Sequence, residues 1–378
     1  MHPQATSCDP LPLAAPGVKA LKPYQPGKPE GELRRELGLN RIVKLASNEN
    51  PLGPSPLALA AARDSLAESH RYPDGNGYAL KQALARHHGV DTAMITLGNG
   101  SNDVLELIAR AFLSPGLEAV YSAHAFAVYP LATQAIGATG RVAPALAVDS
   151  AMPHGHDLEA MGALVNERTR LVFVANPNNP TGTWVEAETL EAFLAALPDH
   201  VLAVVDEAYC DYVERPGFPD ASRWLSRFSN LIVTRTFSKA YGLAGLRVGY
   251  SLSQPAVADL LNRVRQPFNV NIPALAAAEA ALSDREYLAR SRALNRTGMA
   301  LLTEAFTGFG FRVLPSLGNF LCVDVGRPGR QLFDALLREG VIVRPVDNYG
   351  LENFLRISIG TEDENRALIE ALRRVLAA

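Results

Sequence analysis

The sequence predicts an α/β protein with a large domain on a mostly parallel sheet flanked by helices, a smaller α+β domain and an extended N-terminal arm. Apolar runs alternate with helical segments in the middle of the chain, as is typical of a parallel sheet with helices on both faces. The pattern changes after Pro273, and proline is frequent in the first 30 residues. At 378 residues the chain also exceeds the size of one growing hydrophobic core, so two associated domains are expected.

The N-terminal segment is distinguished by its prolines. Proline cannot sit in helix interiors or central strands, so this segment is expected to form an extended arm that lies on another surface. We assign residues 1–50 to this arm, as part of the small domain. The prolines concerned are Pro3, Pro10, Pro12, Pro16, Pro23, Pro26 and Pro29.

Helical and apolar segments alternate over residues 51–273, which we assign to the large domain. Amphipathic helices are expected over residues 57–66, 78–88 and 186–197. Apolar runs of the kind buried on both faces of a sheet cover residues 119–121, 171–175, 202–205, 231–234 and 247–251. Ligands bind at the carboxyl ends of the strands in such sheets, so the residues after these runs are the first candidates for function.

The remaining residues, 274–378, are assigned to the small domain. A long helix rich in Ala, Leu and Arg is expected from Pro273 to about Phe306. Short strands near residues 311–314 and 320–325 follow it, and a helix over residues 362–376 closes the chain.

Composition restricts the kinds of partner. The chain has 36 basic and 39 acidic residues and a formal net charge of −3, which favours a small-molecule partner over nucleic acid or an anionic membrane. Its three cysteines, Cys8, Cys210 and Cys322, are far apart and show no ligand spacing, so neither disulfides nor a metal site is expected. No signal-like start or long apolar stretch is present, and we expect a cytoplasmic protein.

A lysine lies in a glycine-punctuated turn after the apolar run at residues 231–234. The segment TFSKAYGLAGLR places Lys239 among two hydroxyl residues, Thr236 and Ser238, and Arg247. Hydroxyl groups and a guanidinium suit a phosphate, and a lysine beside that phosphate can attack a cofactor carbonyl. The alternatives are a surface lysine or a Walker-type phosphate loop, although the full GxxxxGK[ST] pattern is missing.

A carboxylate follows the apolar run at residues 202–205. Asp206, the first residue of DEAY, is therefore expected at the end of a buried strand, where it needs a cationic partner. The pyridinium nitrogen of pyridoxal phosphate is such a partner, because a paired anion keeps it protonated and the ring electron-accepting. Tyr209 could hydrogen-bond the ring hydroxyl. Alternatively, Asp206 only caps the next helix.

Two further turns present polar groups. Asn179 in NPNNPTG follows the run at residues 171–175 and could reach the ring hydroxyl, although such a stretch taken alone is commonly an ordinary turn. Ser101 and Asn102 in GNGSND precede a helical run, so the N–H groups at that helix N-terminus offer a site for the cofactor phosphate. Asp103 alternatively serves as a simple cap there.

In their order and spacing, NPNNPTG, DEAY and TFSKAYGLAGLRVGY resemble the fold-type I pyridoxal-phosphate enzymes, specifically the class II aminotransferases, over nearly the whole chain. PYQPG, LASNENP, RYP and LRISIG resemble the histidinol-phosphate aminotransferases within that family. The resemblance implies a seven-stranded sheet in the large domain, pyridoxal phosphate as cofactor and a homodimer. It also implies that L-histidinol phosphate and 2-oxoglutarate react to give 3-(imidazol-4-yl)-2-oxopropyl phosphate and L-glutamate, in histidine biosynthesis.

The resemblance further implies roles for individual residues. In the catalytic group, Lys239 would bond covalently to the cofactor aldehyde, Asp206 would bind the pyridine nitrogen, and Tyr209 would hydrogen-bond the ring hydroxyl together with Asn179. The cofactor would otherwise be held by Ser238, Arg247, Ser101, Asn102 and Thr236 at its phosphate, by Phe126 stacked on the ring, and by Tyr72, which would reach the phosphate of the neighbouring subunit. Phe126 departs from the family pattern, in which tyrosine is frequent, but stacking survives the change.

The substrate end should gather cationic and hydroxyl donors, because histidinol phosphate carries a phosphate where amino acids carry a carboxylate. The candidates are Arg356, Arg344, Tyr24 and Asn48. The resemblance implies that Arg356 binds the substrate carboxylate in one half-reaction and the phosphate in the other. Either arginine could instead be a solvated residue at a strand edge, and Asn48 could be only a turn residue.

Other functions stay open at this point. A sister enzyme, an aromatic amino-acid aminotransferase or a threonine-phosphate decarboxylase, would share the scaffold and the lysine chemistry. A binding or regulatory module could hold the cofactor without catalysis, but the joint presence of Lys239, Asp206, Tyr209 and Arg356 argues against it.

Overall fold

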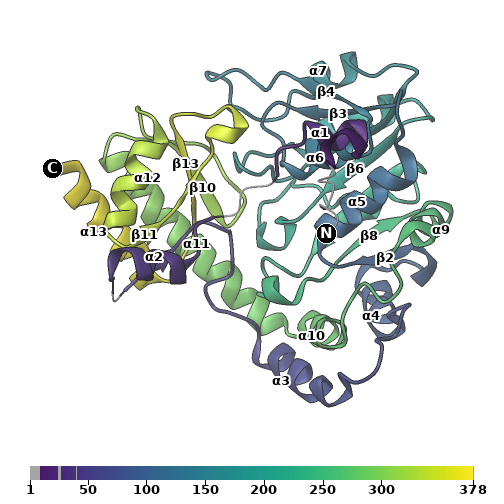
Figure 1. The fold of residues 1–378 in the computed structure, drawn as a ribbon, viewed down its shortest axis with the longest axis horizontal. Helices are drawn as coiled ribbons and strands as arrows, with labels where there is room; N and C mark the ends of the chain where they lie inside the picture. Colours follow the sequence, from purple (N-terminus) through teal and green to yellow (C-terminus); the bar gives the residue numbers. More distant parts are fainter. Residues whose placement is uncertain (1–8, 24–26, 40, 378) are drawn as a thin grey trace, which may run out of the picture.

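The computed structural model describes residues 9–23, 27–39 and 41–377 (Figure 1). Its largest element is a seven-stranded sheet in the order β2-β8-β7-β6-β5-β3-β4. Only β8 runs antiparallel to its neighbours β2 and β7, so the prediction of a mostly parallel seven-stranded sheet is confirmed. The strands are β2 (Ile95–Gly98), β3 (Glu118–Ser122), β4 (Thr139–Ala143), β5 (Thr169–Ala175), β6 (Leu202–Asp206), β7 (Leu231–Thr236) and β8 (Gly249–Ser253).

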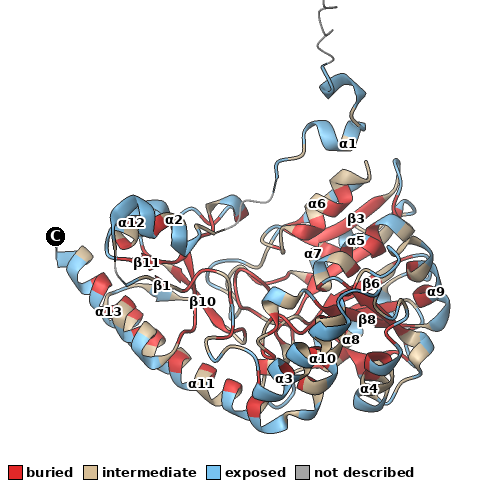
Figure 2. Ribbon diagram, turned by 60° about the horizontal axis from the view of Figure 1, so that its bottom comes forward, coloured by how far each residue is buried: buried red, intermediate tan, exposed pale blue. Residues whose placement is uncertain are grey.

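Helices cover both faces of this large sheet. One face packs against α5 (Ser101–Phe112), α6 (Val128–Ala135) and α9 (Pro255–Val264). The other face packs against α3 (Pro56–Ser65), α4 (Tyr78–His88), α7 (Leu158–Ala163), α8 (Ala187–Ala196) and α10 (Ile272–Ser283). Figure 2 shows that the strands between these two layers are almost entirely buried.

The two-sided cover explains the continuous apolar runs in the sequence. In β5, Val172 and Val174 join the core on one face, whereas Leu171 and Phe173 join the core on the other. Successive side chains of a strand point to opposite faces, so a strand covered on both sides must be apolar at every position. Burial of one such side chain stabilises the fold by about 1.5–3 kcal/mol.

A second, smaller sheet lies beside the first. Its order is β12-β13-β10-β9 and all of its pairs are antiparallel. The strands are β9 (Arg312–Val313), β10 (Phe320–Asp324), β12 (Arg344–Pro345) and β13 (Phe354–Ser358). They pack with α11 (Arg285–Gly308), α12 (Gly329–Arg338) and α13 (Glu362–Ala377), and α11 runs from beside α10 to this sheet (Figure 1). Short 3₁₀ helices connect elements in both parts, at Leu11–Leu13, Leu66–Glu68, Thr92–Met94, Cys210–Tyr212, Ala221–Trp224, Ala244–Leu246 and Asp347–Tyr349.

The N-terminal arm includes helical turns that the sequence analysis did not predict. It contains the short helices α1 (Pro16–Lys19) and α2 (Glu30–Leu37), and prolines stand at their starts. Proline is tolerated there because the first N–H groups of a helix have no partner within it. Beyond α2, β1 (Val43–Lys44) pairs in parallel with β11 (Val341–Ile342), which joins the arm to the smaller part.

The long helix expected after Pro273 is two helices. They meet at Asp284, whose side chain caps α11 by accepting from the backbone N–H of Tyr287. The preceding helix, α10, packs with the large-sheet core through Ala274 and Ala277. The division at residues 50 and 273 stays a prediction.

Three further properties concern the described residues only. Cys210 and Cys322 are free thiols, and Cys8 lies outside the described residues. Within the described ranges, no helix has the length and apolarity needed to cross a membrane. In that same part of the chain, no group of three or more His, Cys, Asp or Glu side chains is arranged to hold a metal ion.

Candidate active site

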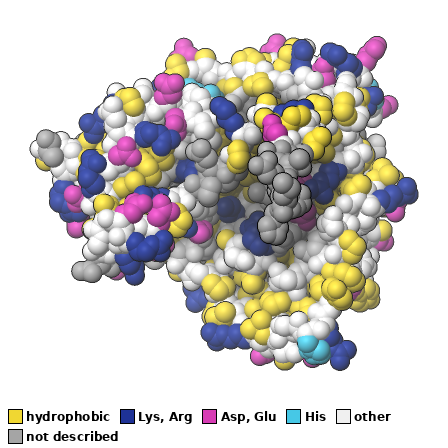
Figure 3. Space-filling view, in the orientation of Figure 1, with side chains coloured by type: hydrophobic (Ala, Val, Ile, Leu, Met, Phe, Trp, Pro, Cys, Tyr) yellow, Lys and Arg dark blue, Asp and Glu magenta, His cyan; other side chains and the backbone are white. Residues whose placement is uncertain are grey.

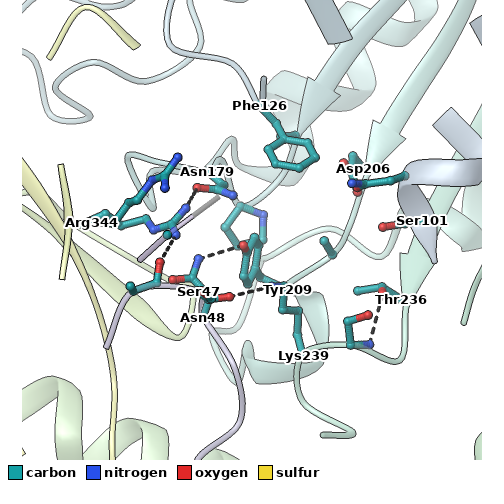
Figure 4. Close-up of a pocket in the computed structure, with 18 of the residues that line it drawn as sticks. Ser47, Asn48, Ser101, Phe126, Asn179, Asp206, Tyr209, Thr236, Lys239 and Arg344 are labelled. Atoms are coloured by element: carbon teal, nitrogen blue, oxygen red, sulfur yellow. Dashed lines mark hydrogen bonds between the residues drawn. The ribbon is translucent and has the colours of Figure 1, made fainter. Parts of the chain in front are cut away.

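One pocket brings together most of the residues that the sequence analysis singled out (Figure 4). It lies at the carboxyl ends of β5, β6 and β7, beside the β12-β13 edge of the small sheet. The hollow between the two halves of the molecule is visible in Figure 3, with Lys and Arg side chains inside it. The predicted residues that line the pocket are Lys239, Asp206, Tyr209, Asn179, Ser238, Arg247, Ser101, Asn102, Phe126, Thr236, Arg356, Arg344 and Asn48.

The two remaining predicted residues are Tyr72 and Tyr24. The Tyr72 side chain is 82% exposed and stacks on Phe268 with ring centroids 4.8 Å apart. Tyr24 lies outside the described residues. The roles predicted for both stay predictions.

Lys239 follows β7 and reaches the centre of the pocket. Its Nζ donates to the carbonyl oxygen of Ser47 at 3.2 Å and lies 5.7 Å from the ring centroid of Tyr209. Burial, aided by the positive charge of Arg356, lowers the pKa of Lys239 from 10.5 to about 8. The amine is therefore neutral, and able to attack a carbonyl, in a much larger fraction of molecules than an exposed lysine near neutral pH.

Asp206 ends β6 with its carboxylate buried. Tyr129 Oη donates to Asp206 Oδ2 at 2.8 Å, and Thr234 Oγ1 donates to Oδ1 at 3.0 Å. Burial raises the pKa of Asp206, while these donors act in the opposite direction. Its hydrogen-bond partners are neutral, and a buried carboxylate is costly unless a cation pairs with it. The site therefore fits the protonated nitrogen of a pyridine ring.

The neighbouring carboxylate, Glu207, lies on the opposite side of the sheet. Arg235 donates from Nε and Nη2 to Glu207 Oε2 at 2.9 and 2.6 Å, and Arg235 also donates to Asp220 at 2.6 Å. The Glu207 side chain is 1% exposed and that of Arg235 is 9% exposed. This buried ion pair joins the ends of β6 and β7 behind the pocket.

A cradle for a phosphate lies at the N-terminus of α5. Ser101 and Asn102 lie in the first turn of α5, where backbone N–H groups have no partner within the helix, and they line the pocket together with Thr236, Ser238 and Arg247. Arg247 Nη1 lies 3.5 Å from Ser238 Oγ. Hydroxyl groups, a guanidinium and a helix N-terminus are the donors that bind phosphate in proteins.

Gly100 makes the close approach of Arg247 possible. A Cβ atom added at Gly100 would lie 2.4 Å from Arg247 Nη2, and the φ of Gly100 is +86°. Only glycine adopts this backbone conformation without strain and leaves room for the guanidinium. The cradle therefore fits the phosphate group of pyridoxal phosphate.

Two arginines face the pocket from the small sheet. Arg344 and Arg356 are register partners on β12 and β13. Arg356 donates to Asn179 Oδ1 at 2.7 Å and to the carbonyl oxygen of Ala46 at 2.6 Å, while its buried Nε has no hydrogen-bond partner among the residues that the structure describes. A buried guanidinium with an unsatisfied N–H beside a second guanidinium favours an anionic ligand.

Asn48 is buried and contacts both halves of the site. Its Nδ2 donates to Tyr209 Oη at 3.0 Å, and its Oδ1 accepts from Ser358 Oγ at 2.9 Å. Burial raises the pKa of Tyr209 to about 12, so the phenol keeps its proton at neutral pH. Asn48 is therefore more than a turn residue, although its predicted contact with the substrate stays a prediction.

Sequence reasoning missed several residues of the site. The carbonyl groups of Ala46 and Ser47 accept from Arg356 and Lys239, but backbone groups carry no sequence signal. Tyr129 lies in α6, a helix that no motif marks. A hydroxyl in the apolar run of β7, Thr234, is the one signal that could have been read, because β7 was expected beside the strand of Asp206.

The doubly wound sheet, with a lysine, a buried carboxylate and a phosphate cradle at its strand ends, defines a pyridoxal-phosphate-dependent transferase. The family profile "Aminotransferase class I and II" matches residues 40–372. The chain belongs to this family, whose members are enzymes that use pyridoxal phosphate.

Particular relatives narrow the comparison. The chain is 61% identical over 373 residues to histidinol-phosphate aminotransferase 2 of Pseudomonas fluorescens Pf-5, covering 98% of this chain and 99% of that protein. It is also 61% identical over 369 residues to histidinol-phosphate aminotransferase 2 of Pseudomonas aeruginosa PAO1, covering 97% and 98%.

Solved structures agree with this placement. The histidinol-phosphate aminotransferase of Sinorhizobium meliloti, in complex with pyridoxal-5′-phosphate, has a TM-score of 0.87 at 34% identity and covers 96% of this chain and 97% of that one. Thermus thermophilus aspartate aminotransferase with maleate has a TM-score of 0.81 at 23% identity, with coverage of 96% and 99%, and supports the fold alone.

Proposed function

We propose that the protein transfers the amino group of L-histidinol phosphate to 2-oxoglutarate, giving 3-(imidazol-4-yl)-2-oxopropyl phosphate and L-glutamate in histidine biosynthesis. The observation that carries this proposal is the pair of adjacent guanidinium groups, Arg344 and Arg356, beside Lys239. A phosphate monoester carries about −1.5 to −2 charges at pH 7, so two cations suit it better than they suit a single carboxylate. The relatives that are 61% identical bear the name of this activity.

Pyridoxal phosphate supplies an aldehyde and a ring that accepts electrons from the substrate α-carbon. We assign the proton transfers to Lys239, whose Nζ, as a free amine in the pocket, would accept and return the proton of the substrate α-carbon. Its lowered pKa suits this exchange, because an amine with a pKa of about 8 both accepts and releases a proton near neutral pH.

The other pocket residues bind and orient. Asp206 would keep the pyridine nitrogen protonated, and Tyr209 and Asn179 would hydrogen-bond the ring oxygen. Ser101, Asn102, Thr236, Ser238 and Arg247 would hold the phosphate, and Phe126 would supply an aromatic surface for the ring. Arg356 keeps Asn179 in place through its 2.7 Å bond, so the residue that binds the substrate anion also touches a residue at the ring.

We also propose a homodimer in which Tyr72 reaches the cofactor phosphate of the partner subunit. Support comes from its 82% exposure and from other exposed apolar side chains of α3 and its flanks, which are Leu52, Leu57, Leu59 and Leu66.

The test of this homodimer mixes the variants Lys239→Ala and Tyr72→Ala, each nearly inactive alone. With shared sites, random pairing restores one intact site in half of the dimers, or about a quarter of wild-type activity. No recovery after mixing would contradict shared sites.

The predicted cytoplasmic location stays a prediction.

A substrate assay tests the reaction. Turnover is measured with 2-oxoglutarate as acceptor and L-histidinol phosphate, L-phenylalanine or L-threonine phosphate as the other substrate, and the Lys239→Ala variant serves as the inactive control. We expect the largest kcat/KM with histidinol phosphate. A larger value with phenylalanine would favour an aromatic aminotransferase, and release of CO2 from threonine phosphate would favour a decarboxylase; either result would refute the proposal.

A further inference from the structure

Three buried side chains form a continuous line of hydrogen bonds from the small sheet to the pocket. Ser358 lies on β13, two residues beyond Arg356, and is 3% exposed. Asn48 is 1% exposed and Tyr209 is 4% exposed. Figure 4 shows the contact between Asn48 and Tyr209 beside Lys239. Neither the reaction nor the motifs in the sequence assign a role to Ser358.

The hydrogen positions in this line follow from its geometry. Ser358 Oγ accepts from the backbone N–H of Asn48 at 2.7 Å, and its own hydrogen goes to Asn48 Oδ1 at 2.9 Å. The amide oxygen of Asn48 therefore faces Ser358, and the amide nitrogen faces Tyr209 at 3.0 Å. The φ of Asn48 is +54°, a conformation that asparagine tolerates better than most residues, so the backbone also fits this arrangement.

The orientation of the amide decides what Tyr209 can do. Because Tyr209 Oη accepts from Asn48 Nδ2, the hydrogen of the phenol is left for another acceptor. Within the described part of the chain, no hydrogen bond uses that hydrogen, and Tyr209 lines the pocket. With the amide turned over, Asn48 Oδ1 would accept the phenol hydrogen and withdraw it from the pocket.

We propose that Ser358 is a positioning residue that holds the Asn48 amide in the one orientation in which Tyr209 donates its hydrogen to the ring oxygen of the cofactor. The inference rests on the proposed role of Tyr209 and adds the group that enforces it. Strand β13, which carries Arg356, would then also determine whether Tyr209 donates a hydrogen bond at the ring.

A spectroscopic titration tests the proposal without relying on turnover. The visible absorption band of the holoenzyme changes when one proton is lost. A hydrogen-bond donor at the ring oxygen draws negative charge from that oxygen, so the proton is bound less tightly and its pKa is lower. Loss of that donor should therefore raise the pH midpoint of the band, by about one unit if one hydrogen bond to a charged group is lost. We expect this rise in Tyr209→Phe and in Ser358→Ala.

Matched variants separate positioning from packing. Ser358→Thr retains the hydroxyl and should restore the wild-type midpoint. Ser253→Ala removes a buried serine from β8, outside the pocket, and should leave the midpoint unchanged. If Ser358 acts through Tyr209, then Ser358→Ala should cause no further shift in a Tyr209→Phe background.

The outcomes distinguish this inference from the role on which it rests. An unchanged midpoint in Tyr209→Phe would reject the proposed role of Tyr209. A shift in Tyr209→Phe with none in Ser358→Ala, or a full additional shift in the double variant, would overturn the role of Ser358. Should Ser358→Ala fail to fold, Ser358→Cys decides: it keeps a side chain of similar size but replaces the hydroxyl with a weak S–H donor, so the midpoint should rise, and an unchanged midpoint would refute the proposal.

Discussion

The reaction of the apoenzyme with pyridoxal phosphate should depend on pH as expected for an amine with a pKa of about 8. Burial is the main cause of the low pKa of Lys239, and the charge of Arg356 adds to it. The neutral amine is the form that attacks the aldehyde. At pH 7 about 9% of such amines are neutral, against about 0.03% at the ordinary value of 10.5, so the gain in reactive amine is about 300-fold.

Rapid mixing of the apoenzyme with pyridoxal phosphate, followed by absorbance between pH 6.5 and 9.5, measures this dependence. The rate of bond formation should rise about tenfold per pH unit below pH 8 and level off above it. Nα-acetyl-lysine, treated in the same way, reports the titration of the cofactor itself and is used to correct the profile. A profile that keeps rising towards pH 10.5, or one that is flat, would refute the reasoning.

The contribution of Arg356 can be tested in the same assay. Arg356→Gln removes the positive charge that disfavours protonated Lys239, so the midpoint should move to higher pH. It should stay below 10.5, because burial, the larger cause, remains. Arg344→Gln is the matched control, since Arg356 and not Arg344 is a main cause of the shift. Equal shifts in both variants would indicate a general change in the pocket.

Three further predictions concern cofactor affinity and stability. Asp206→Ala removes the anion at the pyridine nitrogen and should weaken pyridoxal phosphate binding about 10- to 100-fold in an equilibrium titration; unchanged affinity would contradict the assigned contact. Gly100→Ala should weaken binding about tenfold or more by displacing Arg247, whereas Gly116→Ala, at a similar positive φ with open space around it, should not. Glu207→Ala removes the buried carboxylate beside Arg235 while Asp220 still pairs with the guanidinium, and should lower the free energy of unfolding of the apoenzyme by about 1–3 kcal/mol in urea denaturation; a loss well below 1 kcal/mol would show that water reaches the site.

The sequence predicted those parts of the fold in which burial is uniform. The strand at Leu171 to Ala175 is covered on both faces, so every residue is apolar and the run is visible without a structure. The edge strand β4 could not be found in this way, because most of its residues are exposed. The break at Asp284 was missed because α10 and α11 are both rich in helix-forming residues. A single residue, Asp284, separates the two helices, and its side chain caps α11.

The site was predictable where side chains carry the chemistry. Lys239, Asp206 and Arg247 follow strands and stand in motifs, so their convergence could be expected from the sheet. The contacts of Ser47 and Ala46 are made by backbone carbonyl groups, which any residue could supply. The orientation of Asn48 depends on Ser358, which is distant in the sequence, and only the packed structure brings the two together.

Asp206 and Glu207 are consecutive acids with different neighbours, and this gives the far side of the sheet an influence on the near side. A slip of β6 by one residue could place the longer Glu207 in the pocket, and Asp206 would then move to the position of Val205 on the other face of the sheet. The two hydrogen bonds from Arg235 to Glu207 Oε2 oppose that slip, because it would break both of them. A charge pair outside the pocket thus helps to hold Asp206 at the position in β6 from which its carboxylate faces the pocket.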